Sequence, residues 1–157
     1  LATSSAASDV YKRQLLATPN DLGRFRRTGQ RRDLNRPQFK ADTVERRLQD
    51  PDSDATAVTS VLAHALRVRR DQPALHPDAA MEVMSAGRSD LVMLLRRGGG
   101  QTLVAVHNVT PSRLTLVLGR LGGRTGLAWT DCLSGSSETH GSQLQLEPYA
   151  VHWLIQA

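Results

Sequence analysis

The spacing of apolar residues predicts one long helix in the first half of the chain. Between residues 53 and 71, apolar residues recur at intervals of three and four and would form one stripe along a helix: Val58, Val61, Leu62, Ala65 and Leu66. The turn at Pro51-Asp52-Ser53-Asp54 places acidic groups at its start, and Pro73 prevents it from continuing. We therefore expect a well-defined helix between this turn and Pro73.

The period changes from about Ala79 onward, where apolar and polar residues alternate. Alternation of this kind is typical of strands with one buried face. The candidate strands are 81–85, 90–96, 102–109, 113–118, 127–132 and 144–155. Glycine-rich or serine-rich breaks separate them at 98–100, 119–123 and 134–142. Short strands at this spacing predict an antiparallel β-sandwich.

Residues 15–36 show no sustained period and contain Pro19, Gly23 and Gly29. We expect an irregular, arginine-dense loop there, with one helical turn near 21–27. After Pro37, Asp42 could cap a short helix through Leu48. The predicted fold class is thus α+β, with a loop and helices over 15–77 and an all-β domain over 78–157.

Residues 1–14 differ from the rest of the chain. The chain begins with Leu1, and Val10-Tyr11-Lys12-Arg13-Gln14 matches one reading frame of the end sequence of a library-preparation transposon. We expect residues 1–14 to be a sequencing-adapter scar and disordered. A natural flexible tail is the alternative.

Composition and charge narrow the function classes. The chain of 157 residues is 39% hydrophobic, enough for a core. Its longest apolar runs are about five residues, against the ~20 that a membrane helix needs. The net charge of +5 arises in residues 1–36, which hold eight Lys or Arg against three Asp, because residues 37–157 hold twelve of each sign. With only 4% aromatic residues, neither a nucleic acid nor a membrane is the expected partner, although a basic nucleic-acid-binding protein stays an alternative.

Few residues carry recognisable chemistry. The five histidines lack the i, i+4 spacing of a zinc pair, and the single cysteine, Cys132, has no basic neighbour in sequence. No metal site is expected. The arginines of 15–36 remain, and their guanidinium groups suit bidentate binding of a phosphate or carboxylate. The alternative without a binding role is that most of these arginines are solvated or pair with Asp21 and Asp33.

A family resemblance rests on Arg27-Thr28-Gly29, on the stretch 51–77 and on five further motifs, two in the arginine loop and three in the predicted β domain. They are Thr18-Pro19-Asn20-Asp21-Leu22, Arg32-Asp33-Leu34-Asn35-Arg36, Val106-His107-Asn108-Val109-Thr110, Asp131-Cys132-Leu133-Ser134-Gly135 and the closing 146–154 segment. Together they span most of 15–157 and resemble the C-terminal part of sucrose-phosphorylase-like and glucosylglycerate-phosphorylase-like enzymes of glycoside hydrolase family 13. The resemblance implies the end of a (β/α)8 barrel followed by a small β domain.

The resemblance also implies an activity. Such enzymes are retaining α-glucoside phosphorylases that use a sugar substrate and inorganic phosphate, without a cofactor, in the cytoplasm. Their catalytic carboxylates lie in the barrel, upstream of the position of Leu15, so no catalytic residue is expected here, and the missing barrel is the expected intramolecular partner.

The resemblance assigns roles to a few residues of the loop. Arg32 is expected in the glucose-binding subsite and Asn20 and Asp21 near it, whereas Asp33 and Arg36 are expected to brace the loop. The loop motifs favour the glucosylglycerate type slightly, and the acceptor stays open among fructose, fructose 6-phosphate, glycerate and glycerol. The alternative from another class is a stand-alone β-sandwich that binds carbohydrate or a protein without catalysis.

Overall fold

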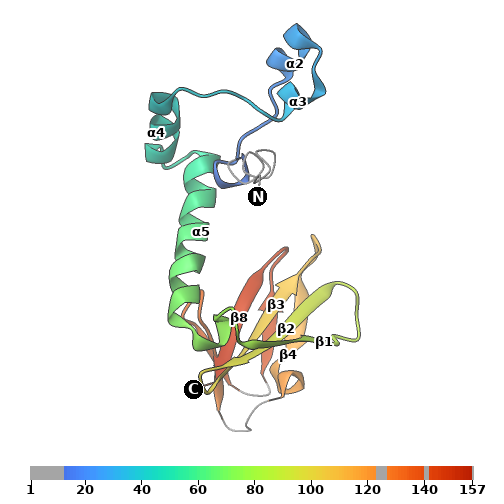
Figure 1. The fold of residues 1–157 in the computed structure, drawn as a ribbon. Coiled ribbons are helices and arrows are strands. Elements are labelled where there is room, and N and C mark those ends of the chain that lie inside the picture. The colour runs from blue at the N-terminus through green and yellow to red at the C-terminus, as the bar shows by residue number, and fades with distance from the viewer. Residues whose placement is uncertain (1–12, 123–126, 140–141, 157) are drawn as a thin grey trace. The chain divides into compact units, whose positions relative to one another are not determined.

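The computed structural model describes residues 13–122, 127–139 and 142–156 (Figure 1). Most of the expected scar, residues 1–12, lies outside the described residues, whereas Arg13 and Gln14 lie in a helical turn. The chain divides into two compact units, Leu1–His64 and Ala65–Ala157. The division falls within one continuous helix, α5 (Asp54–Asp71).

The first unit contains two short helices, and the first of them lies where one helical turn was expected near 21–27. Helix α2 (Leu22–Thr28) begins at Asp21, whose carboxylate accepts a hydrogen bond from the Arg24 N–H at 2.7 Å. This contact satisfies one of the amide groups that have no partner within a first helical turn. The helix ends at Gly29, which has a φ of 67°. Helix α3 (Arg31–Leu34) follows and was not anticipated, because four residues are too few to show a period.

Two further helices match the expected segments closely. Helix α4 (Ala41–Gln49) begins after Lys40, so the prediction that Asp42 caps it is wrong: the Asp42 carboxylate lies in the first turn and accepts from the Thr43 N–H at 2.8 Å. Helix α5 is capped by the Ser53 hydroxyl, which accepts from the Thr56 N–H at 3.1 Å.

The predicted apolar stripe of α5 is largely exposed. The exposed fraction is 68% for Val61, 41% for Leu62 and 62% for Leu66, and the only described residue of α5 that is buried is Ala55. A helix of this composition normally buries such a stripe against another element.

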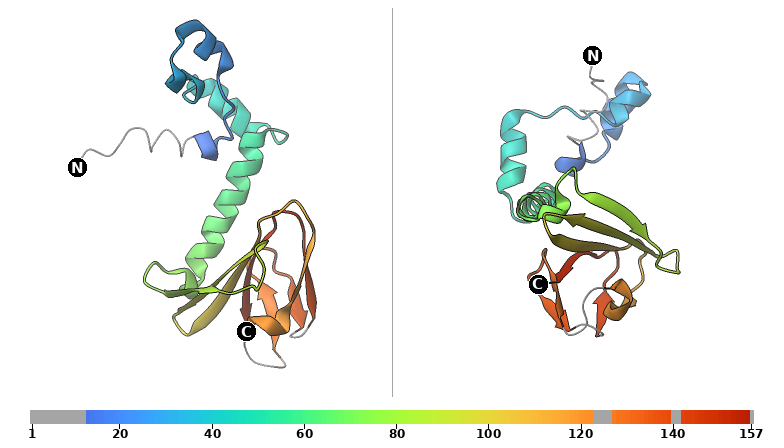
Figure 2. Two further views of the ribbon diagram at one scale, coloured as in Figure 1. Left: turned by 90° about the vertical axis from the view of Figure 1, so that its right-hand side faces the viewer. Right: turned by 60° about the horizontal axis from the view of Figure 1, so that its bottom comes forward.

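The second unit consists of two antiparallel sheets (Figure 2). The larger sheet has the order β1 (Ala80–Met84), β2 (Leu91–Gly98), β3 (Gln101–Asn108), β8 (Val151–Gln156), β5 (Ala128–Asp131) and β6 (Ser137–Thr139). The smaller sheet pairs β4 (Leu114–Val117) with β7 (Gln143–Leu146). The expected α+β class with an antiparallel β-sandwich is confirmed.

The core of this unit lies between the two sheets. Met93, Val104 and Val106 of the larger sheet pack with Leu116 and Leu146 of the smaller one. A short 3-10 helix, η2 (Leu118–Leu121), closes one end with the buried side chains of its two leucines. On the other face of the larger sheet, η1 (Pro73–Leu75) covers Leu103 and Ala105.

The turn between β2 and β3 requires glycine for two separate reasons. Gly98 pairs with Gln101, which leaves Gly99 and Gly100 as a two-residue turn with φ values of 56° and 78°. A Cβ on Gly99 would lie 2.6 Å from the Cβ of Pro73, whereas one on Gly100 would meet nothing within 4 Å. The left-handed backbone and the close approach of η1 thus coincide at Gly99.

Two strand predictions are wrong. The segment 144–155 is not one strand: β7 and β8 belong to different sheets, and the turn between them contains Tyr149 at a φ of 58°. The serine-rich segment 134–142, expected as a break, contains β6. In both cases the residue types suit strands and turns equally, so the pattern alone does not locate where a strand begins or ends.

Buried Asn108 links the two sheets at the end of β3. Its amide nitrogen donates to the carbonyl oxygens of Ser112 (2.7 Å) and Glu147 (2.8 Å). Its amide oxygen accepts from the N–H and the hydroxyl of Thr110, at 3.0 and 2.9 Å. Only 3% of Asn108 is exposed, so these bonds replace its contacts with water.

Candidate functional site

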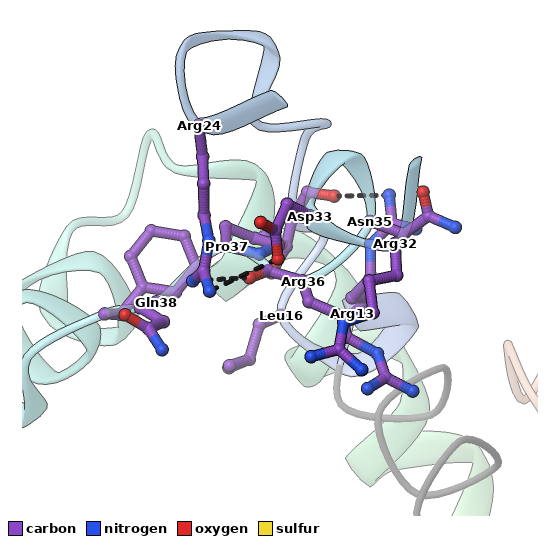
Figure 3. A pocket seen from close by; sticks show the side chains of 11 residues that line it. Arg13, Leu16, Arg24, Arg32, Asp33, Asn35, Arg36, Pro37 and Gln38 are labelled. Carbon is purple, nitrogen blue, oxygen red and sulfur yellow. Dashed lines mark hydrogen bonds and ion pairs between the residues drawn. The ribbon is translucent and has the colours of Figure 1, made fainter. Parts of the chain in front are cut away.

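The arginine-rich segment of the first unit encloses a cavity of about 440 Å³ (Figure 3). Helices α2 and α3 and the segment after them supply most of its walls. The lining residues are Arg13, Leu16, Thr18, Arg24, Arg32, Asp33, Asn35, Arg36, Pro37, Gln38 and Phe39. Four guanidinium groups therefore surround the cavity, together with a single carboxylate.

An ion pair at the centre of this wall joins the two short helices. Arg24 Nη2 of α2 lies 3.2 Å from Asp33 Oδ1 of α3, and Arg24 Nη1 donates to the backbone carbonyl of Arg36 at 3.4 Å. Figure 3 shows the Arg24 side chain reaching toward both acceptors. The side chain of Asp33 is only 7% exposed, so its carboxylate is held inside the wall. The segment is thus fixed by contacts between side chains that are nine residues apart in sequence.

The carboxylate of Asp33 stays ionised in this setting. The Thr28 hydroxyl beside it lowers its pKa most, burial acts in the opposite direction, and the charges of Arg24 and Arg32 lower it further. The net result is a pKa below the ordinary value of 3.8. Asp33 is therefore a permanent negative charge at neutral pH.

The structure brings together three of the five residues that the resemblance singled out. Arg32, Asp33 and Arg36 all line the cavity. Asn20 and Asp21 do not line it: the side-chain oxygen of Asn20 accepts from Arg13 Nη2 at 2.8 Å, and Asp21 caps α2.

Sequence reasoning missed Arg24 as a site residue. It is one of several arginines in a run without a period, and only the folding of α2 against α3 selects it as the partner of Asp33. The spacing of Arg24 from the capping Asp21 is the signal that could have located it within the first turn of a helix.

A second polar cluster lies in the β unit. The buried carboxylate of Asp131 accepts hydrogen bonds from His152 Nδ1 (3.0 Å), the Ser134 hydroxyl (2.9 Å) and the N–H groups of Leu133 (3.1 Å) and Trp153 (2.9 Å). Burial raises the pKa of Asp131, but these bonds together lower it below 3.8. Both oxygens are occupied from within the chain, so this cluster joins β5, the following turn and β8 rather than presenting a reactive group.

The remaining candidates carry no chemistry of their own. Burial, and then the charge of Asp131, raise the pKa of the Cys132 thiol, which is the opposite of what a nucleophilic cysteine needs. In the parts of the chain that the structure describes, no group of three or more His, Cys, Asp or Glu side chains could hold a metal ion. No helix in those parts is long and apolar enough to cross a membrane.

No protein-family model matches the sequence. The chain is 31% identical over 148 residues to a glucosylglycerate phosphorylase of Allomeiothermus silvanus, a match that covers 93% of this chain and 24% of that protein. The chain thus spans about a quarter of the length of this curated relative.

Solved structures are similar in fold. The trehalulose synthase MutB from Pseudomonas mesoacidophila MX-45 matches 73% of this chain and 20% of its own, with a TM-score of 0.54 and 19% identity. An Anoxybacillus α-amylase matches 79% of this chain and 25% of its own, with a TM-score of 0.57 and 14% identity. AmyP in complex with maltose covers 64% of this chain and 20% of its own, with a TM-score of 0.57 and 16% identity.

The fold that the chain shares with these structures is an α+β arrangement with an antiparallel β-sandwich. The similarity in sequence extends over both units, because it covers 93% of the chain. The resemblance drawn from the motifs is confirmed as a similarity: the chain is similar in sequence to a glucosylglycerate phosphorylase and in fold to an α-amylase.

Proposed function

We propose that the chain is the C-terminal part of a retaining α-glucoside phosphorylase. The parent enzyme would convert sucrose or a related glucoside, such as glucosylglycerate, and inorganic phosphate into α-glucose 1-phosphate and the free acceptor. The observation that carries the proposal is the 31% identity, over 93% of the chain, to a protein that bears the name glucosylglycerate phosphorylase.

The proposed reaction is a double displacement by two carboxyl groups. An aspartate attacks the anomeric carbon while a glutamic acid protonates the oxygen of the leaving acceptor, and a β-glucosyl ester forms. A phosphate oxygen then attacks the same carbon, the ester bond breaks and the aspartate is released. Two inversions give net retention. We assign both carboxyl groups to the barrel of the parent enzyme, which leaves no catalytic residue in this chain.

The chain would contribute binding rather than chemistry. We assign Arg32 to the glucose-binding subsite, where its guanidinium would hydrogen-bond sugar hydroxyls or a barrel carboxylate. Asp33 and Arg24 would hold the segment in shape, because their ion pair joins α2 to α3 at 3.2 Å. Arg36 would brace the same wall, since its backbone carbonyl accepts from Arg24. Asn20 and Asp21 would act only through this scaffold, because they lie outside the lining of the cavity.

We further propose that the barrel of the parent enzyme covers the exposed stripe of α5. Val61, Leu62 and Leu66 are each at least 41% exposed in the chain by itself, which is unusual for aligned large apolar residues. The proposal includes a cytoplasmic location, because a charged phosphate ester formed there would not cross a membrane unaided.

The test begins with the DNA upstream of the codon for Leu15. An open frame that encodes a barrel with a strand-end aspartate and glutamate is the expected result. The full-length enzyme, incubated with inorganic phosphate and either sucrose or glucosylglycerate, should then release α-glucose 1-phosphate, while the 157-residue chain alone should release none. Phosphorolysis by the short chain, or hydrolysis without phosphorolysis by the full enzyme, would contradict the proposal. An upstream frame without a barrel would favour the stand-alone binding module.

A further inference from the structure

We infer that the outer face of the larger sheet is a second surface by which the β unit binds the barrel of the parent enzyme. The strands β1, β2, β3 and β8, which lie side by side in that sheet, form this face (Figure 1). The inference goes beyond the contact proposed for α5, and it rests on the proposed function for the identity of the barrel. Whether the face is covered can be measured without any turnover.

The register of the four strands defines which side chains share this face, because side chains alternate between the two faces of a sheet. One row across the strands consists of Val83, Leu94, Ala105 and Trp153. The two adjacent rows consist of Met81, Arg96, Leu103 and Ile155, and of Val92, His107 and Val151. The alternate residues, among them Met93 and Val104, belong to the core between the two sheets.

The strands of this sheet are apolar on both faces. Strand β2 begins with the uninterrupted apolar run 91–95, so its residues do not divide into a buried apolar face and a solvated polar one. An antiparallel sheet with one face in water normally shows that division. The smaller sheet does show it, because its outer face carries the exposed residues Thr115, Gln143 and Gln145. The larger sheet therefore has the pattern of a sheet that is covered on both sides.

Within the described chain, this outer face is covered only at its middle. Ala74 and Leu75 of η1 pack on Leu103 and Ala105, which are buried. The apolar side chains around them stay in contact with solvent, and their exposed fractions are 71% for Val83, 60% for Met81, 41% for Val92 and 40% for Val151. Apolar residues that are exposed together on neighbouring strands form the kind of patch that marks an interface.

The face carries little charge. Among its residues in β1, β2, β3 and β8, Arg96 is the only one that is charged at neutral pH. The Arg96 guanidinium group donates to three backbone carbonyl oxygens, those of Ala74 (2.9 Å), His76 (2.7 Å) and Ala79 (3.3 Å). Burial lowers the pKa of His107 below its ordinary value of 6.5, so this imidazole is neutral at pH 7. Covering the face therefore takes no unpaired charge out of water, which would oppose burial.

The barrel is the occupant because the same apolar surface continues onto α5. Leu66, which lies on the part of α5 that belongs to the second unit, lines an open cavity of about 370 Å³ together with Pro73 and Leu75 of η1. The surface of α5 assigned to the barrel thus passes through η1 to the outer face of the larger sheet. Since the chain spans about a quarter of the curated relative, three quarters of a parent of that length remain to supply the cover.

The first test compares the oxidation of Met81 in the 157-residue chain and in the full-length parent enzyme. Hydrogen peroxide converts the thioether of an accessible methionine to a sulfoxide, and mass spectrometry locates the added oxygen. If the barrel covers the face, Met81 should react about tenfold or more slowly in the full-length enzyme. Met93, which is 4% exposed, should react slowly in both proteins and serves as the internal reference.

The second test places a charge on the face. Val83→Glu should shift the midpoint of thermal unfolding of the 157-residue chain by no more than about 3 °C, because Val83 is exposed there. In the full-length enzyme the same substitution should lower the midpoint by about 5 °C or more, since the charge would be buried against the barrel. Val83→Lys should act alike, because a buried charge of either sign is unfavourable.

Thr115→Glu is the matched control for the second test. It replaces another exposed β-branched residue, on the outer face of the smaller sheet, and should shift neither midpoint by more than about 3 °C. Circular dichroism of the 157-residue variants should match that of the unchanged chain. If the charged variants of the full-length enzyme do not fold, the oxidation of Met81 in the unchanged enzyme decides.

Equal oxidation of Met81 in the two proteins overturns the inference, and so does a full-length enzyme whose midpoint Val83→Glu leaves unchanged. A 157-residue chain in which Met81 is already protected, and which sediments as a dimer that Val83→Glu separates, shows a second copy on the face and overturns it as well. Failure of the proposed function leaves a different record. A full-length enzyme that protects Met81 but catalyses no phosphorolysis refutes the proposed function alone, whereas phosphorolysis with an unprotected Met81 refutes the inference alone.

Discussion

Replacing Asn108 by alanine should destabilise the β unit by about 3 kcal/mol. The side chain is 3% exposed and makes four hydrogen bonds of 3.0 Å or shorter, two as a donor and two as an acceptor. A typical internal hydrogen bond contributes about 1 kcal/mol net, so the four together would contribute about 4 kcal/mol. Ser112 and Glu147 are exposed residues, and their freed carbonyl oxygens would regain water, which reduces the loss.

The assay is urea unfolding followed by tryptophan fluorescence. Both tryptophans, Trp129 and Trp153, lie in strands of the β unit, and Trp129 is 2% exposed, so the signal reports on this unit. Gln143→Ala is the control, because Gln143 lies exposed on β7 and its loss should cost within about 0.5 kcal/mol.

A loss below about 1 kcal/mol for Asn108→Ala would refute the reasoning. It would mean that water or a small backbone shift replaces the four bonds, and that the contact between the two sheets does not depend on this amide. An unchanged slope of free energy against urea is required for either conclusion, because a changed slope would indicate an altered unfolded or native state.

Three other predictions concern the rest of the chain. The folded pKa of Asp131 is below its unfolded value near 3.8, so its contribution to the free energy of unfolding is complete above that pH and is lost as the pH falls through the folded pKa. The Asp131→Asn variant should be less stable than the wild type at pH 7, and its free energy of unfolding should decline less below about pH 4. Parallel curves of stability against pH for the two proteins would contradict this. Gly99→Ala should lower the free energy of unfolding by about 2–4 kcal/mol, because of the φ of 56° and the close approach to Pro73, whereas Gly100→Ala should lower it by about 1 kcal/mol. Equal losses of stability in thermal unfolding would show that the contact with Pro73 contributes nothing. The isolated chain should bind the dye ANS and aggregate through the α5 stripe, and the double variant Leu62→Gln/Leu66→Gln should reduce both effects. A wild-type chain that is monomeric and does not enhance ANS fluorescence would contradict the prediction that the stripe lacks a partner.

The helices and the sandwich were predictable because their signals are local. The Pro51-Asp52-Ser53-Asp54 turn, the spacing of three and four, and Pro73 together bound α5 to within a residue or two. Alternation likewise located β2 and β3, whose glycine turn is a strong signal. The separation of β7 from β8 was not predictable, because it depends on Tyr149 adopting a left-handed backbone that no local pattern in 144–155 requires.

The candidate site also has a part that the sequence predicts and a part that it does not. The motif around Arg32 and Asp33 located one wall of the cavity, because those residues are adjacent in sequence. The ion pair of Asp33 with Arg24 depends on two short helices packing together, and Asp131 meets His152 only through the pairing of β5 with β8. Contacts of this kind follow from register and packing, which a single sequence does not specify.

The two polar regions of the molecule differ in whether their side chains face one another or line a cavity, and this difference indicates where binding is to be sought. In the β unit, the side chains of Asn108 and Asp131 form hydrogen bonds with neighbours within the chain. These bonds hold strands and turns together. In the first unit, the single carboxylate of the cavity is committed to Arg24 while further guanidinium groups share the same wall. The cavity of the first unit is therefore the region to test for binding, because its lining side chains surround open space, whereas the polar groups of the β unit contact one another.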